Sequence, residues 1–238
     1  MAHVTLRATS GSQGPSCAIC GVRRQAICSA LSAEQLPRLA QIAATRSLEP
    51  GQTLFHEGDP AEDLFTVTVG MIKLFKLMPD GRRQIMGFVL PGDVLGLSAQ
   101  KSFVYSAEAV TPAEVCRFRR PHLDRLLEEA PALERALLAR ATSELAAAQE
   151  QMLLLGRKSA RERLASFLVG FARRLGAGKG QPFELAMTRT DIADYLGLTI
   201  ETVSRTLTQL RREGLIELAD KAHVVIRDPD ALGDAADG

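Results

Sequence analysis

The stretch TRTDIADYLGLTIETVSRTLTQLRRE, residues 188–213, decides the fold, because it has the pattern of two short helices joined by a tight turn. Thr188 and Asp191 have the spacing of a capping box at the start of the first helix. Gly197 predicts the end of that helix, since glycine readily adopts the left-handed conformation of a C-terminal cap. Thr199 can cap the second helix through its hydroxyl. We therefore expect helix, turn, helix.

The second helix of this stretch has an apolar and a polar face. Its polar face is matched to DNA, because the Glu201 carboxylate can accept from the cytosine amino group and the Arg205 guanidinium can bond guanine O6 and N7. A helix-turn-helix places the first turns of its second helix against base edges in the major groove. The alternative is a solvated helix with an internal Glu201–Arg205 pair, worth only a few tenths of a kcal/mol. The apolar face is predicted to hold Ile200, Val203, Leu207 and Leu210. Contact with DNA is expected from Thr199, Glu201, Thr202, Ser204 and Arg205.

Length and composition set broad limits on the class of protein. The 238 residues allow one large or two modest domains, and an apolar content of 46% can fill a core. The net charge is only +1, but residues 157–227 hold 13 Lys and Arg against 8 Asp and Glu, which suits a phosphate-facing domain. Residues 1–16 lack the apolar core of a signal peptide, and no apolar run is long enough to span a membrane. A cytoplasmic protein with a disordered start and no membrane contact is expected.

The four cysteines are unevenly placed. Cys17, Cys20 and Cys28 form a C-x-x-C-x(7)-C pattern, whereas Cys116 lies far away in the apolar run AEVCRF. Disulfides are disfavoured in a reducing compartment, and no βαβ pattern supports a thiol redox enzyme of the thioredoxin type. Four thiolates suit zinc or an iron–sulfur cluster, although zinc sites usually pair two C-x-x-C knuckles. Cys116 can equally be a buried small side chain, so the residues alone leave a metal site and unligated thiols open.

The middle of the chain changes from a helical to a β pattern. Ser32 is expected to begin a short helix, SAEQLPRLAQIA, and the β pattern runs from Leu48 to Phe118. The segment Pro79-Asp80-Gly81 is a hairpin turn signal. Several short strands with regular turns predict an antiparallel roll or barrel.

A helical region follows from Pro121, and part of it has coiled-coil spacing. Its apolar positions recur in steps of 4, 3, 4 and 3: Ala141, Leu145, Ala148, Met152 and Leu155. Leu133 and Leu137 extend the apolar side upstream. A helix packed only on its own roll is the alternative, but so narrow a seam favours contact with a second copy. A homodimer also matches a palindromic DNA site by symmetry.

The last part of the chain completes a winged DNA-binding unit. Ser159–Leu175 is predicted as an amphipathic helix that ends before a glycine-rich connector. Residues 215–227 predict two short strands with a turn near Asp220, and the acidic tail from Asp228 is expected to fray. The domain boundaries expected from these patterns are a cysteine-bearing arm at 1–30, a roll at 31–120, a dimerisation helix at 121–156 and a winged helix-turn-helix at 157–238.

This order of units resembles the CRP/FNR transcription regulators over nearly the whole chain. The segments that carry the resemblance are MLLLGRKSARERLASFL, MTRTDIADYLGLTIETVSR and LPGDVLGL. The resemblance implies an α+β fold with an N-terminal antiparallel β-roll of the cyclic-nucleotide-binding type, a long dimerisation helix and a C-terminal winged helix-turn-helix. The E-x-x-S-R pattern of Glu201, Ser204 and Arg205 looks like the FNR branch, which implies a TTGAT…ATCAA palindrome as the DNA site.

The resemblance also bears on cofactors and partners. Cys17, Cys20, Cys28 and Cys116 match the arrangement by which FNR-type oxygen sensors hold a [4Fe–4S] cluster. The alternative is a cluster-free regulator of the FixK kind, with zinc-bound or incidental cysteines. No cyclic nucleotide is expected, because residues 101–102 read Lys-Ser, and lysine does not reproduce the bidentate phosphate binding of arginine.

Two further features complete the comparison with the FNR type. The hairpin at residues 78–84 resembles the surface through which FNR-type activators contact RNA polymerase; an ordinary exposed hairpin is the alternative. FNR-type proteins can carry an acidic residue on the dimer seam, where this chain has Ala148. The resemblance therefore implies a dimer that is less dependent on the cluster.

Overall fold

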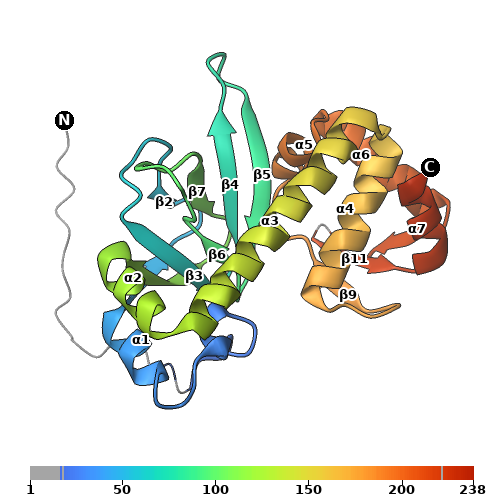
Figure 1. The fold of residues 1–238 in the computed structure, drawn as a ribbon. Helices are drawn as coiled ribbons and strands as arrows, with labels where there is room; N and C mark the ends of the chain where they lie inside the picture. Colours follow the sequence, from blue (N-terminus) through green and yellow to red (C-terminus); the bar gives the residue numbers. More distant parts are fainter. Residues whose placement is uncertain (1–16, 18, 221) are drawn as a thin grey trace.

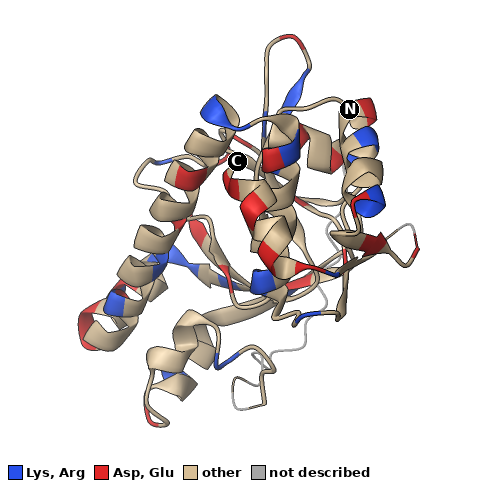
Figure 2. Ribbon diagram, turned by 90° about the vertical axis from the view of Figure 1, so that its right-hand side faces the viewer, with Lys and Arg blue, Asp and Glu red and all other residues tan. Residues whose placement is uncertain are grey.

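The computed structural model describes residue 17, residues 19–220 and residues 222–238. The expected disordered start at residues 1–16 lies outside the described residues. A β-rich half and a helical half lie side by side, and the long helix α3 (Pro131–Arg157) runs diagonally between them (Figure 1). Acidic and basic residues are interspersed along the ribbon in this view rather than separated into two faces (Figure 2).

The N-terminal half is a roll of two antiparallel sheets, which confirms the predicted roll and the α+β class. One sheet has the strand order β1-β8-β3-β6, and the other has the order β2-β7-β4-β5. Val67, Ile72 and Val115 are fully buried between the two sheets, because alternate side chains of each strand face the interior. The strands are β1 (Ala43–Leu48), β2 (Thr53–Phe55), β3 (Asp63–Val69), β4 (Ile72–Leu77), β5 (Arg83–Val89), β6 (Val94–Leu95), β7 (Ser106–Ala109) and β8 (Ala113–Arg119).

The start of the roll differs from the sequence prediction. The helix expected from Ser32 to Ala43 is shorter: α1 spans Leu36–Ile42, and the 3₁₀ helix η1 (Ile27–Ala30) precedes it. Ser32 still caps a turn, since its Oγ accepts from Gln35 N at 3.2 Å. Strand β1 was missed, because it begins at Ala43 and not at Leu48. Its sequence has no clear alternation, and its pairing with β8 is a long-range contact that local pattern does not reveal.

The helical region after the roll is divided in two. Helix α2 spans Arg120–Glu129, and α3 begins at Pro131 after a non-helical Ala130. A residue before proline is sterically disfavoured in the helical conformation, which explains the break. Leu133 and Leu137, predicted to extend the apolar side of this helix upstream, are buried in the core of their own roll and are not part of its exposed side. The exposed leucine that continues that side upstream is Leu138.

The C-terminal half contains the winged helix-turn-helix that the sequence predicts. Helix α4 spans Ala160–Leu175, capped by Ser159 and ended by a left-handed Gly176. Helix α5 (Arg189–Leu196) and helix α6 (Ile200–Arg212) follow. The wing strands β10 (Ile216–Leu218) and β11 (His223–Ile226) form as predicted, and the sequence missed a third strand, β9 (Pro182–Glu184), which pairs with β11.

The acidic tail is a helix, which contradicts the expectation that it frays. Helix α7 spans Pro229–Asp237, with Asp228 as a cap that accepts from Ala231 N. Leu232 is fully buried among the apolar residues of the C-terminal half. The tail also holds the junction of α3 and α4, because Lys158 Nζ donates to the Ala236 carbonyl at 2.6 Å and to Ser166 Oγ at 3.0 Å.

Candidate DNA-binding surface and thiol cluster

Local capping fixes the angle between α5 and α6. Thr188 and Asp191 form the predicted capping box, and Gly197 ends α5 at φ 62°. The Thr199 hydroxyl accepts from Thr202 N at 3.2 Å, so the start of α6 is also capped as predicted. Val203 and Leu210 are fully buried and hold α6 on the domain core, whereas Ile200, expected on the same apolar face, is 43% exposed. The first turn of α6 therefore projects beyond the core.

The opposite face of α6 is exposed and open. Glu201, Ser204 and Arg205 are exposed, and Thr202 is half-buried. The internal Glu201–Arg205 pair does not form among the described residues, and Arg205 makes no other hydrogen bond or ion pair there. The backbone N–H of Glu201 and the hydroxyl of Thr199 lower the pKa of the Glu201 carboxyl, so it is charged at neutral pH. A free guanidinium and a carboxylate on one exposed face can contact base edges.

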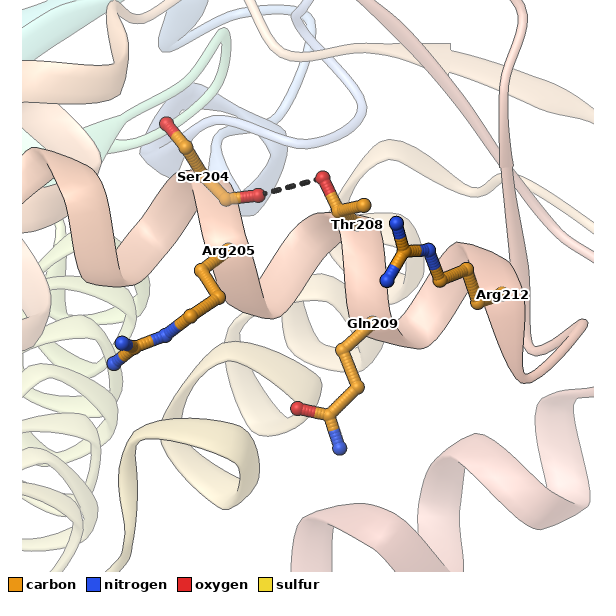
Figure 3. Close-up of a pocket in the computed structure, with 5 residues that line it drawn as sticks. All are labelled: Ser204, Arg205, Thr208, Gln209 and Arg212. Atoms are coloured by element: carbon orange, nitrogen blue, oxygen red, sulfur yellow. Dashed lines mark hydrogen bonds between the residues drawn. The ribbon is translucent and has the colours of Figure 1, made fainter.

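The exposed face continues beyond the residues that the sequence singled out. Ser204, Arg205, Thr208, Gln209 and Arg212 line one shallow hollow along α6, and Arg205 and Gln209 extend from the helix on the same side (Figure 3). The sequence analysis missed Thr208, Gln209 and Arg212. Thr208 and Gln209 follow Ser204 and Arg205 by four residues, and Arg212 follows Thr208 by four, so this helical spacing is the signal that could have found them.

A second hollow lies between α5, the end of α6 and the wing. Arg189, Arg211, Leu218 and Asp220 line it. Asp220 shapes the wing turn, because its Oδ1 accepts from the backbone N–H groups of Ala222 and His223, each at 2.7 Å. These hydrogen bonds, with that of the His223 ring, lower the pKa of Asp220 to about 2. These hydrogen bonds join the described ends of the wing turn beside α6.

Cys116 and two thiols of the N-terminal arm lie on one face of the roll. Cys116 is buried in β8, and Cys17 and Cys28 pack against the same apolar cluster. Burial, followed by the nearby Cys17, Cys20 and Cys28 thiols, raises the pKa of Cys116 to about 12. Burial is also the main cause that raises the pKa values of Cys17 and Cys28. Within the described residues no group of three or more His, Cys, Asp or Glu side chains is arranged so that it could hold a metal ion.

One buried hydroxyl beside Cys116 bears on whether this face fits a sulfur-ligated group. Thr66 lies directly opposite Cys116 in the β3–β8 pair, so the two side chains share a face of the sheet. Thr66 is 4% exposed, and its Oγ1 has no hydrogen-bond partner among the described residues. A buried donor without a partner is costly in an apolar cluster. Thiolates ligate iron–sulfur clusters and hydroxyls can donate to their sulfurs, so these residue types suit such a group, whereas their described arrangement does not form a metal-binding group.

The roll is joined to α5 by a buried ion-pair network. Asp191 Oδ1 lies 2.9 Å from Lys73 Nζ of β4 and 2.9 Å from Arg83 Nη2 of β5. Lys73 also pairs with Glu108 at 2.9 Å, and Arg83 Nε pairs with Asp194 at 3.0 Å. Burial by itself would raise the pKa of Asp191, but hydrogen bonds from Thr188 and Lys73 outweigh it and leave the pKa lowered. The helix-turn-helix is therefore fixed to the β4–β5 hairpin through charged groups.

The exposed side of α3 carries a row of large apolar residues. Leu138, Leu145 and Met152 are 67%, 59% and 66% exposed and recur every seven residues. Ala141 and Ala148 are also exposed, so they lie open beside this row. Leu155 differs from the other predicted seam residues, because it is half-buried against the core of its own C-terminal half. Large exposed apolar residues in register are typical of a helix that meets another helix.

A cyclic-nucleotide-binding type of roll, a long connecting helix and a winged helix-turn-helix with an open recognition face define a DNA-binding transcription regulator. Two family models match the chain: the cyclic nucleotide-binding domain over residues 45–130 and the Crp-like helix-turn-helix domain over residues 162–235. The chain belongs to the CRP/FNR family, which consists of transcription regulators rather than enzymes. Within the described residues no helix is long and apolar enough to cross a membrane.

Relatives named FixK and FnrL each match most of the chain. The nitrogen fixation regulation protein FixK of Bradyrhizobium diazoefficiens is 44% identical over 86% of this chain and 87% of its own. The transcriptional activator protein FnrL of Cereibacter sphaeroides is 40% identical over 93% of this chain and 94% of its own. The solved structure of FixK2 from Bradyrhizobium japonicum has a TM-score of 0.77 at 40% identity and covers 82% of this chain and 97% of that one. The chain is thus similar to both FixK and FnrL.

Proposed function

We propose that this protein is an oxygen-responsive transcription regulator that holds a [4Fe–4S] cluster and binds a TTGAT-type palindrome as a homodimer. Cys17, Cys20, Cys28 and Cys116 are the proposed ligands. The observation that supports the proposal is that Cys17 and Cys28 of the arm pack against the apolar cluster of the roll that contains Cys116, with Cys20 near enough to raise the pKa of Cys116. A cluster held by these cysteines would supply oxygen-reactive chemistry, and its ligands would join the arm, which packs against the roll, to Cys116 of β8.

The arm leads directly into the helix proposed for dimerisation. Helix η1 follows Cys20, contains Cys28, and packs against α3. An ordered arm therefore supports the start of α3, and α3 presents Leu138, Leu145 and Met152 to a second copy. Pairing of two copies would place two recognition helices about one DNA turn apart.

The cluster is tested by anaerobic reconstitution. About four iron and four sulfide per chain are expected, and Cys116→Ala is expected to lose most of both. Thr45→Ala is the matched control, because Thr45 pairs opposite Cys116 on β1 but is exposed and is not a proposed ligand. Substoichiometric iron in the unaltered protein after reconstitution would remove the sensing part of the proposal.

A cluster-free regulator of the FixK kind is the second candidate. Two observations favour it: FixK is among the relatives at 44% identity, and the thiols in the described structure do not form a metal-binding group. The same reconstitution separates the two candidates, because a FixK-like protein binds its operator equally well with and without iron. Zinc in place of iron after purification under air would be a further outcome in its favour.

The DNA-binding proposal assigns base contact to Thr199, Glu201, Thr202, Ser204 and Arg205. Arg205→Ala is expected to relax discrimination at one guanine of each half-site by about 1–3 kcal/mol. Arg212→Ala, at the far end of the same hollow, is the matched control and should weaken binding evenly across sequences. Competition binding with a TTGAT palindrome and single-base variants measures both. Unchanged sequence preference in Arg205→Ala would contradict the assignment.

The dimer proposal assigns contact to Ala141, Leu145, Ala148, Met152 and Leu155, and Leu138 joins them in the exposed row. Leu145→Glu is expected to convert a dimer to a monomer in sedimentation measurements. Leu153→Glu is the control, because Leu153 is 59% exposed like Leu145 but stands outside the seven-residue repeat. A monomer in both variants, or in neither, would remove the assignment of this seam.

Two further parts of the proposal concern other ligands. The β4–β5 hairpin projects from the roll (Figure 1), and we propose residues 78–84 at its tip as the contact with RNA polymerase. Transcription assays with Asp80→Ala test this, since activation should fall while DNA affinity is unchanged. No cyclic nucleotide is proposed as a ligand, because Lys101-Ser102 stands where an arginine would be needed, and calorimetry with cyclic AMP tests that part.

A further inference from the structure

The turn Pro91-Gly92-Asp93, between β5 and β6, contacts two helices outside the roll as well as closing on itself. Asp93 Oδ2 accepts from the backbone N–H of Leu90 at 2.9 Å, which closes the turn. The same oxygen lies 2.6 Å from Arg174 Nη2 of α4, in the DNA-binding half. Asp93 Oδ1 lies 3.9 Å from Arg140 Nη1 of α3. One carboxylate therefore faces the roll, the long helix and the DNA-binding half.

Arg174 holds two points of the roll at once. Its Nη1 donates to the Phe88 carbonyl at 2.9 Å, while its Nη2 reaches Asp93. Phe88 itself packs against Phe167 of α4 and Tyr195 of α5, with ring centroids 6.4 and 5.5 Å apart. The guanidinium therefore ties α4 to the roll at two positions, Phe88 and Asp93, beside this aromatic contact. A two-point contact of this kind restricts orientation more than a single ion pair does.

Arg140 and Gly92 connect the turn to the cysteine-bearing arm. Arg140 Nη2 donates to the backbone carbonyl of Gln25, which lies between Cys20 and Cys28. Gly92 has φ 96°, and a Cβ built on it would lie only 2.9 Å from Gln25 Cβ and 3.3 Å from the Gln25 carbonyl carbon. The arm thus lies directly against the turn, and glycine is needed there for both conformation and space.

We infer that Asp93 and Arg140 are positioning residues that couple the conformation of the cysteine arm to the placement of the DNA-binding half. The contacts form a continuous chain from Gln25 through Arg140 and Asp93 to Arg174. If the arm shifts, Arg140 loses its hydrogen bond to the Gln25 carbonyl. Its guanidinium is then no longer held near Asp93, so the electrostatic attraction on the Asp93 carboxylate changes. The inference rests on the proposed function only for what moves the arm; the contacts themselves need no cluster. It gives the LPGD turn a role beyond that of a turn in the roll.

Linkage provides the first test, in the full-length reconstituted protein. The affinity for a TTGAT duplex is measured by fluorescence anisotropy with and without cluster, and a ratio of about 5- to 150-fold is typical of such coupling. Asp93→Asn and Arg140→Gln are expected to bring this ratio close to one while iron content stays unchanged. Arg173→Gln and Arg135→Gln are matched controls, since both arginines are exposed on the same two helices and should keep the ratio.

A second measurement separates this inference from the proposed function. Because coupling is reciprocal, binding of the duplex to the reduced, cluster-free protein should change the rate at which the arm thiols are alkylated. Asp93→Asn and Arg140→Gln should abolish that change, and a cycle with Arg174→Gln should be non-additive. A protein that takes up no iron but shows this effect would remove the sensor and keep the coupling. Variants that retain both the affinity ratio and the DNA-dependent alkylation overturn the inference.

Discussion

Replacing Asp191 by alanine should destabilise the protein more than loss of a helix cap can explain. The Asp191 side chain is only 5% exposed, and its Oδ1 lies 2.9 Å from both Lys73 Nζ and Arg83 Nη2. Its Oδ2 accepts a hydrogen bond from the Thr188 hydroxyl at 2.7 Å. Loss of the capping box costs about 1 kcal/mol. Loss of charge-assisted hydrogen bonds to buried partners costs about 1.5–3 kcal/mol.

Two compensating contacts limit the total. Lys73 keeps Glu108 at 2.9 Å and Arg83 keeps Asp194 at 3.0 Å, so neither cation is left wholly unpaired. The penalty should therefore stay below the sum of a lost cap and an uncompensated buried charge. A decrease of about 2–4 kcal/mol in the free energy of unfolding is expected, of which only about 1 kcal/mol should appear in Thr188→Ala.

Urea unfolding followed by circular dichroism measures these differences. Asp80→Ala is the control for removal of a carboxylate, because Asp80 pairs with Arg82 at the exposed hairpin and its loss should leave stability nearly unchanged. The lowered pKa of Asp191 adds a pH test. A carboxyl whose pKa is lowered by folding stabilises the fold at pH values above its ordinary pKa of 3.8. This contribution is lost as pH falls through the lowered pKa of the folded state. As pH falls below ~4, the Asp191→Ala variant should therefore lose less stability than the unaltered protein does.

If Asp191→Ala lowers the free energy of unfolding only as much as Thr188→Ala does, the role of the buried ion pairs is refuted.

Three other predictions follow from single side chains. Thr66→Val should raise the free energy of unfolding of the cluster-free protein by up to about 1–3 kcal/mol, because it removes an unpartnered buried hydroxyl. A cluster bound to this variant, followed by its visible absorption, should decay faster in air. No change in either measurement would contradict the fit of this hydroxyl to a sulfur-ligated group. Leu232→Ala should cost about 2–5 kcal/mol in a denaturant titration, since Leu232 is fully buried, and a loss below 0.5 kcal/mol would mean that α7 contributes nothing. Desolvation and then the nearby Asp93 raise the pKa of Glu144 to about 7, so its contribution to stability is present below pH 4.5 and lost as pH rises through 7. Glu144→Gln should reduce the change in melting temperature between these two pH values, by a small amount because Glu144 is in contact with solvent. An unchanged dependence of melting temperature on pH would contradict the raised pKa of Glu144.

Interactions between residues close in sequence allowed much of the fold to be predicted. The capping box of Thr188 and Asp191, the left-handed Gly197 and the cap at Thr199 each depend on residues within four positions of one another. Such short-range contacts form wherever the sequence places them, so the helix-turn-helix could be predicted. The alternation of short strands and turns likewise predicted an antiparallel roll.

Only the tertiary structure decided which surfaces meet. Leu137 and Leu138 are adjacent leucines, yet Leu137 is buried in the roll and Leu138 is exposed. The break at Ala130 sets the rotation of α3 about its axis, and this rotation decides which of the two faces the roll. The tail from Asp228 has few apolar residues, but burial of Leu232 among distant core residues makes it a helix. The convergence of Cys116 with the arm, and the contacts of Asp93 with α3 and α4, join residues far apart in the chain. Long-range packing and charge pairing are set by the whole fold, and no local pattern encodes them.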